Sequence, residues 1–208
     1  MLIRFNRSLA VREAYSLYDA GEYRAVIRYC TEQLLADGAD PELRLLRGVA
    51  HLDCGQPNEA VADWRACCGD AHNAGVAHYY LGSFLSEQSP EHEPSAMEHF
   101  ETAVRLGWVE GHIGKGSVLL SLGFQARNEH RPAVAAELFR QSVVELTTAL
   151  SSPAPFSRRR AVGLRASVHY NLGDHTAFLQ DRAQEKGIVV GETDREADPR
   201  ATGSELYS

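Results

Sequence analysis

Small residues recur along this sequence with a fixed period of 34 positions. The first column of small residues holds Ala14, Gly48, Gly82 and Gly116. Seven positions further on, a second column holds the turn-forming residues Gly21, Gly55, Ser89 and Gly123. Two columns that keep one period through four units predict four copies of one supersecondary structure.

A pattern of small and large apolar residues follows each predicted turn. A small residue is followed four positions later by a large ring, and three positions after that by another small residue. The instances are Ala60, Trp64 and Cys67; Ala96, Phe100 and Ala103; and Ala135, Phe139 and Ser142. The first unit is looser, with Val26, Cys30 and Gln33 at these positions, or Ala25 and Tyr29 one position earlier. Spacings of four and three place side chains on one helix face, so each unit is predicted as helix, turn, helix.

The repeated unit resembles the tetratricopeptide repeat (TPR) family. The stretches that carry the resemblance are "LLRGVAHLDCGQPNEAVADWRAC" in the second unit and "YYLGSFLSEQ…SAMEHFETAV" in the third. The resemblance covers residues 8–146 well and residues 155–187 loosely. It implies an all-α fold in which antiparallel helix pairs stack into a right-handed superhelix with a concave inner face.

Three segments are expected along the chain. Residues 1–150 form four TPR-like helix pairs, and residues 151–187 form an atypical fifth pair that acts as a C-terminal cap. Pro153 and Pro155 are expected to break the helix where these two segments meet. Within the fifth pair, Asp174 is a predicted N-cap and Gly187 is a predicted helix stop. Residues 188–208 are acidic and without period, and are expected to be disordered.

Two units contain extra residues. The third has two, around Pro90 and Pro94, and the fourth has seven, around "FQARNEHRP". Seven residues fit as two extra helical turns or as one longer loop without breaking the face pattern, and both alternatives stay open.

Composition and charge exclude several classes of protein. The 208 residues are 44% hydrophobic and carry a net charge of −7, which argues against nucleic acid as the main partner. The one basic cluster, Arg158 to Arg160 with Arg165 nearby, is interpreted as a solvated run that flanks a helix. No apolar run is long enough to cross a bilayer and no secretory signal is evident, so we expect no membrane partner and a cytoplasmic location.

Three stretches superficially resemble sites for chemistry. "GHIGKGS" has neither the spacing nor the preceding strand of a phosphate-binding loop, and Gly116 is interpreted as a packing glycine. "EHEPSAMEH" lacks the histidine pair of a zinc protease and is expected to be a solvated loop. A third group of residues has a spacing reminiscent of a metal site: His51, Cys54, Cys67, Cys68 and His72. Cys67 occupies a packing position, so we expect no metal, no cofactor and no catalytic residue, with a Cys/His enzyme or enzyme accessory subunit as the alternative.

The resemblance implies that the first helix of each pair lines a binding groove. Family offsets from the small residue place ten residues in it: Tyr15, Tyr18, Asp19, Leu45, Val49, Leu52, Asp53, Tyr79, Ser83 and Glu87. A groove with aromatic, aliphatic and acidic groups suits a peptide segment with apolar anchors and basic residues. We therefore expect a non-catalytic adaptor or chaperone-like scaffold that binds a protein partner. A regulatory sensor of a peptide is a further alternative, as are repeat packing for these residues and self-association through the terminal units.

Overall fold

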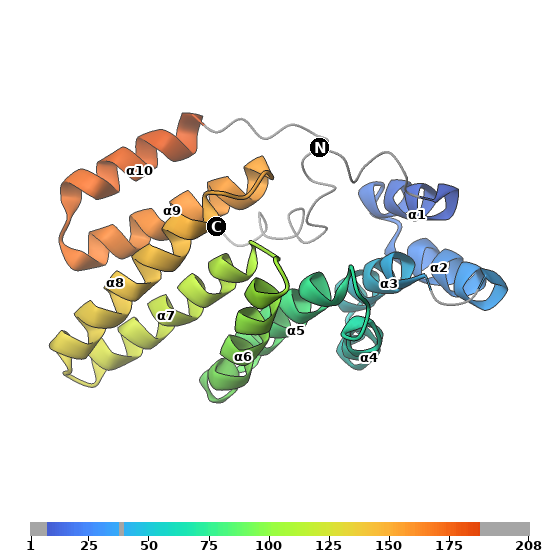
Figure 1. Cartoon of the computed structure of the whole chain (residues 1–208), viewed down its shortest axis with the longest axis horizontal. Helices are drawn as coiled ribbons and strands as arrows, with labels where there is room; N and C mark the ends of the chain where they lie inside the picture. The colour runs from blue at the N-terminus through green and yellow to red at the C-terminus, as the bar shows by residue number, and fades with distance from the viewer. Residues whose placement is uncertain (1–7, 38–39, 188–208) are drawn as a thin grey trace. The chain divides into compact units, whose positions relative to one another are not determined.

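The computed structural model describes residues 8–37 and 40–187, and within them it contains ten α-helices, one short 3₁₀-helix and no strand (Figure 1). The α-helices are α1 (Leu9–Asp19), α2 (Tyr23–Asp37), α3 (Pro41–Asp53), α4 (Pro57–Cys67), α5 (Ala74–Gln88), α6 (Glu93–Arg105), α7 (Gly111–Asn128), α8 (Pro132–Ala149), α9 (Pro155–Leu172) and α10 (His175–Gly187). The 3₁₀-helix η2 covers Pro90–His92. The predicted all-α class is confirmed, and the expectation for residues 188–208 lies outside the described residues.

The described chain divides into two compact units. The N-terminal unit ends at Ala77 and contains α1 to α4 with the start of α5. The C-terminal unit begins at His78 and contains the rest of α5 and all later helices. No helix in the described ranges is long and apolar enough to cross a membrane.

Local side-chain chemistry fixes where several helices begin and end. The carboxylate of Asp40 accepts hydrogen bonds from the backbone N–H groups of Glu42 and Leu43, which would otherwise have no partner at the start of α3. Asp174 accepts from the N–H of Ala177 at 3.0 Å, which confirms the predicted N-cap of α10. Gly21, between α1 and α2, has φ +75°, a conformation that glycine adopts without strain.

The structure of the fourth helix pair differs from the prediction. Gly123 is not a turn residue but lies buried inside α7, which is 18 residues long. The turn to α8 comes later, where His130 has φ +58°. The seven extra residues are therefore helical, and they lengthen the pair by two turns, which keeps the packing faces aligned.

The third helix pair also differs from the prediction made for it. The stretch around Pro94 is not a solvated loop, because η2 is followed directly by α6, whose first turn contains Pro94. Proline suits that position because it has no N–H to leave unpaired. Glu93 is buried, and its Oε1 accepts a hydrogen bond of 2.5 Å from the Ser121 hydroxyl on α7.

The glycines that recur every 34 positions let two helices approach until the backbone of one contacts a side chain of the other. A Cβ at Gly48 would lie 2.5 Å from Nε1 of Trp64, and one at Gly82 would lie 2.9 Å from the Phe100 ring. In the longer fourth pair, Gly116 lies against Leu146 and Gly123 lies against the Phe139 ring. The predicted packing role of Gly48, Gly82 and Gly116 is confirmed.

Candidate partner-binding surface

The ten predicted groove residues fall into two groups by burial. Three acids are exposed, namely Asp19, Asp53 and Glu87, and two apolar residues are half-buried, namely Tyr15 and Leu52. The other five are buried: Tyr18, Leu45, Val49, Tyr79 and Ser83. All ten lie on α1, α3 or α5, the first helices of the first three pairs.

In the N-terminal unit, two of the predicted residues are bonded to each other. The Tyr18 hydroxyl on α1 donates a hydrogen bond of 2.6 Å to Asp53 Oδ2 at the end of α3. The Tyr18 ring lies 5.1 Å from the ring of Tyr23, at the start of α2. This arrangement joins the first three helices at the point where the carboxylate of Asp53 is exposed.

Two adjoining hollows open beside this carboxylate. The larger, which we call the Asp53 hollow, has a volume of about 590 Å³ and is lined by Gly21, Glu22, Tyr23, Arg24, Ala25, Asp53 and Cys54. The smaller, about 280 Å³, is lined by Arg24, Ile27, Cys54 and Gln56. Arg24 and Cys54 line both, so the two hollows adjoin at the start of α2 and the turn after α3.

In the C-terminal unit, a predicted groove residue contacts another part of the chain. Arg160, near the start of α9, donates a hydrogen bond of 3.0 Å from Nη1 to the hydroxyl of Tyr79 on α5. The Tyr79 ring also packs 6.0 Å from the ring of Phe100. The sequence placed Arg160 in a solvated basic run, and no spacing rule links residues 81 positions apart.

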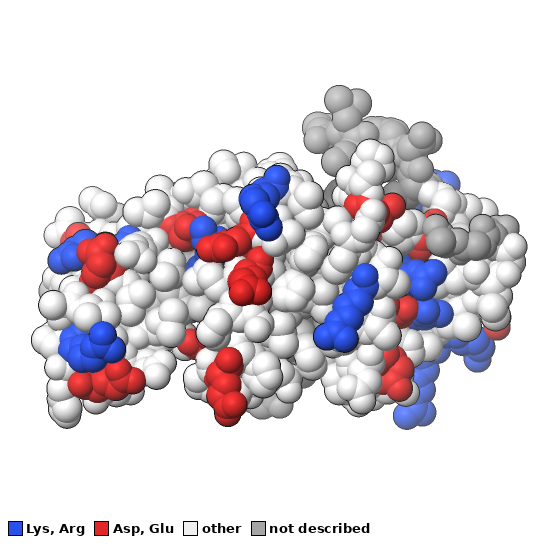
Figure 2. All heavy atoms as spheres, turned by 60° about the horizontal axis from the view of Figure 1, so that its bottom comes forward, with Lys and Arg blue, Asp and Glu red and all other residues white. Residues whose placement is uncertain are grey.

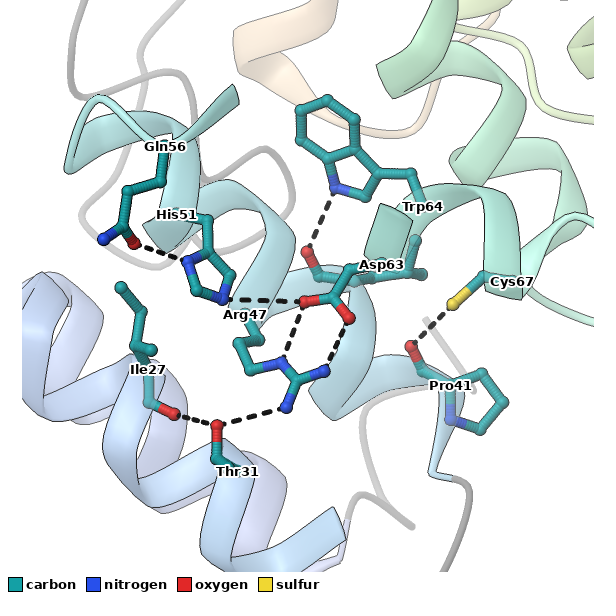
Figure 3. Close-up of polar contacts among 10 residues, drawn as sticks. Ile27, Thr31, Pro41, Arg47, His51, Gln56, Asp63, Trp64 and Cys67 are labelled. Carbon is teal, nitrogen blue, oxygen red and sulfur yellow. Dashed lines mark hydrogen bonds and ion pairs between the residues drawn. The ribbon is translucent and has the colours of Figure 1, made fainter. Parts of the chain in front are cut away.

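A buried polar network holds α3 and α4 together (Figure 3). Arg47 binds the carboxylate of Asp63 through two hydrogen bonds, from Nε at 2.8 Å and from Nη2 at 2.6 Å. Its Nη1 donates to the hydroxyl of Thr31 on α2 at 3.1 Å. His51 adds a longer contact of 4.0 Å to Asp63. The network therefore fixes a helix pair to the helix before it.

The last helix pair repeats this network with the same spacing. Arg165, His169 and Asp181 are separated by four and twelve positions, as are Arg47, His51 and Asp63. Arg165 binds Asp181 through Nε at 3.0 Å and Nη2 at 2.6 Å, and donates to Thr147 on α8 at 3.1 Å. The sequence search followed apolar columns and missed this polar one, although the recurring spacing was there to be found.

Two buried cysteines, one of them in the candidate metal stretch, have thiols of low reactivity. Burial raises the pKa of Cys67 to about 12, so its thiol is protonated at neutral pH and lies 3.6 Å from the Pro41 carbonyl. Burial likewise raises the pKa of Cys30 to about 12. Across residues 8–37 and 40–187, no three His, Cys, Asp or Glu side chains come together in a way that could hold a metal ion.

Two histidines of the third helix pair share one hydrogen bond. His78 on α5 and His99 on α6 approach to 2.9 Å between their Nδ1 atoms, so one ring donates and the other accepts. Burial lowers the pKa of His78, and the positive charge of Arg105 lowers it further. Protonating both rings would remove the acceptor and place two positive charges side by side.

This pair makes the stability of the chain depend on pH. The pKa of His78 is lower in the folded state than in the unfolded chain, so the unfolded state binds more protons than the folded state as the pH falls through about 6.5. We expect the free energy of unfolding to fall as the pH is lowered from about 7.5 to about 5.5. His78→Gln should reduce that fall, measured by urea unfolding at both pH values. An equal fall in wild type and His78→Gln would contradict the prediction.

Charges of both signs are interspersed on the molecular face drawn in Figure 2. Acidic and basic side chains alternate there, and neither sign forms a continuous field on that face. Any charge-based recognition on it would therefore depend on local groups.

Comparison with known proteins shows the fold and no more. No protein-family model matches the sequence, and no curated protein matches it significantly. The crystal structure of TTC0263, a thermophilic TPR protein in Thermus thermophilus, matches with a TM-score of 0.61 and 18% identity, over 91% of this chain and 96% of that one. The crystal structure of MamA matches with a TM-score of 0.50 and 18% identity, over 88% and 95%. This chain has a TPR-like solenoid fold, as its resemblance to the family implied.

Proposed function

We propose that this chain is a non-catalytic adaptor or chaperone-like scaffold that binds a segment of a partner protein on the first helices of its helix pairs. The observation that carries this proposal is a column of exposed acids. Asp19, Asp53 and Glu87 lie 34 residues apart, at matched positions on α1, α3 and α5, and all three are exposed. Acids repeated at one position of the first three units favour a ligand with basic residues and speed its encounter.

The neighbouring apolar residues supply the second part of the surface. Tyr15 on α1 and Leu52 on α3 are half-buried, so part of each side chain is available to an apolar anchor of the partner. The other five residues of the predicted groove are buried, and one of them, Tyr18, donates a hydrogen bond to Asp53. A partner segment with alternating apolar and basic residues fits both parts.

For the Cys/His enzyme alternative, the state of Cys67 argues against that residue as the reactive thiol. Cys30 and Cys67 are buried, with pKa values raised by burial to about 12. A thiol acts as a nucleophile or metal ligand through its thiolate, which is scarce at neutral pH for such a group.

Charge reversal tests the acid column. The double variant Asp53→Lys with Glu87→Lys is expected to bind a partner identified by crosslinking in native lysate about tenfold more weakly than wild type. The affinity is measured by isothermal titration with the purified partner. Glu59→Lys with Glu101→Lys changes the net charge equally on the exposed surfaces of α4 and α6, and should leave the affinity unchanged. If both double variants bind alike, the acids of α3 and α5 are not part of the binding surface.

A further inference from the structure

The helix α10 buries a single side chain, and that side chain is charged. It packs antiparallel to α9 within the C-terminal unit (Figure 1). Of its 13 residues only Asp181 is buried, at 4% exposed. Leu179 is 63% exposed, and Ala177 and Phe178 are half-buried. Because burial of apolar surface is the main force that holds helices together, α10 has little of that force.

The second helix of every other pair buries apolar side chains. These are Val26 and Cys30 on α2; Ala60, Trp64 and Cys67 on α4; Ala96, Phe100 and Ala103 on α6; and Ala135, Phe139, Leu146 and Ala149 on α8. Over residues 8–37 and 40–187, α10 is the one second helix without a fully buried apolar side chain.

The position that anchors α4 holds a charged residue on α10. Trp64 directly follows Asp63, and its ring lies against the backbone of α3. Arg182 directly follows Asp181, and its side chain is 50% exposed. Arg182 forms an ion pair with Glu185 of its own helix. The last pair therefore keeps the buried acid of α4 and lacks the ring beside it.

Polar groups hold α10 in place of apolar packing. The guanidinium of Arg165 on α9 donates to the Asp181 carboxylate at 3.0 Å and 2.6 Å, and the Arg165 side chain is 13% exposed. It also donates to Gln184 on α10 at 3.3 Å. Breaking a buried ion pair by removing one partner is costly, because the other charge stays behind. The attachment of α10 therefore depends on this pair.

One part of the polar contact is incomplete in the last pair. In the N-terminal unit, the His51 Nδ1 shares a hydrogen bond of 2.7 Å with Gln56, five positions later. Five positions after His169 stands Asp174, whose carboxylate caps α10 instead. The His169 Nδ1 is buried and has no hydrogen-bond partner among the described residues. A buried polar atom without a partner costs free energy, so this contact stabilises its helix pair less than its counterpart does.

We propose that α10 is a lid, which detaches from α9 as one unit while the other helices of the C-terminal unit stay folded. The Arg165–Asp181 pair is the latch that keeps the lid closed. Gly173, between the two helices, has φ +77°, and a Cβ there would meet nothing within 4 Å, so it is the hinge.

The lid covers a specific face of α9. Val162 and Ala166 are buried, and spacings of four and three place them on the same helix face as His169, which contacts Asp181 on the lid at 3.8 Å. Opening uncovers these side chains, so the lid controls access to an apolar strip. The inference stands apart from the proposed function, because no partner takes part in the opening.

Amide hydrogen exchange of the ¹⁵N-labelled full chain, followed by NMR under native conditions, tests the lid. In the wild type, the amides of α10 after its first turn should exchange at similar rates, and roughly tenfold faster than the slowest amides of α9. Asp181→Ala removes the latch, and should speed the exchange of α10 by about tenfold or more without changing the slowest amides of α9.

Asp63→Ala is the matched control, because it removes the same two hydrogen bonds from a pair that keeps its ring. There we expect α3 and α4 to lose protection together. Equal acceleration of α9 and α10 in Asp181→Ala would overturn the lid, because the two helices would then open as one. Exchange that slows steadily from Gly187 back to His175, alike in wild type and Asp181→Ala, is fraying of a helix end and would also overturn it.

A variant that supplies the missing anchor should act in the opposite direction. Arg182→Leu places an apolar side chain at the position that Trp64 occupies on α4, and should slow the exchange of α10 severalfold. Lys186→Leu adds the same side chain at an exposed position of α10 and should leave the exchange unchanged. If the two variants exchange alike, the missing anchor is not what frees α10, and the proposal is wrong.

Discussion

Asp63→Ala is expected to lower the free energy of unfolding of the N-terminal unit by about 3 kcal/mol, the lower end of the range for breaking a buried ion pair. Asp63 is 5% exposed and accepts two hydrogen bonds from the Arg47 guanidinium. Of the three hydrogen bonds that the Arg47 guanidinium makes in the network, removing the carboxylate leaves the one to Thr31. The positive charge then remains in a site largely shielded from water. The loss is measured by urea unfolding followed by circular dichroism.

The loss should come from an uncompensated charge and not from a missing attraction. The double variant Arg47→Met with Asp63→Leu removes both charges and fills similar volume, so it should recover most of the stability. Arg140→Ala breaks an ion pair to Glu137 on the exposed surface of α8 and should leave the unfolding midpoint unchanged. If Asp63→Ala unfolds at the same urea concentration as Arg140→Ala, the network contributes nothing to stability.

The helices and their packing could be predicted from the sequence because sterics decide them. Two helices approach closely where one side chain is small or absent, so Gly48 and Gly82 were expected to face large rings, and they face Trp64 and Phe100. The structure of the seven extra residues in the fourth unit was not decided by sterics in this way. Seven residues make two helical turns or a loop with equal effect on the faces, so the sequence did not exclude a turn at Gly123. The Phe139 ring against Gly123 shows that the helix continued.

The candidate site was predicted less completely, because family offsets give a position on a helix and not its exposure. Asp53 and Val49 both fit the offsets, yet Asp53 is exposed and Val49 is fully buried. The buried ion pairs were missed for a related reason. Arg47 and Asp63 are 16 positions apart across a turn, and only the packing of α3 on α4 brings them together.

Gly114→Ala is expected to destabilise the C-terminal unit by about 2 kcal/mol, although alanine is the better helix former by about 1 kcal/mol in an exposed helix. Gly114 lies on α7 directly against the ring of Phe100 on α6. An added Cβ would overlap three atoms of that ring, and Phe100 is itself 1% exposed, so it has no room to move. Urea unfolding of the full chain measures the loss.

Two further variants show whether the overlap is the cause. Phe100→Leu creates space next to residue 114, so in that background Gly114→Ala should cost much less, which a double-mutant cycle records as a coupling energy. Gly163→Ala places its Cβ in the middle of α9, where it meets only the flexible end of Glu185, and should leave stability unchanged or raise it. A loss in Gly114→Ala that persists unchanged in the Phe100→Leu background would mean that overlap with this ring is not the cause, and that the close approach of α6 and α7 does not depend on the missing side chain at residue 114.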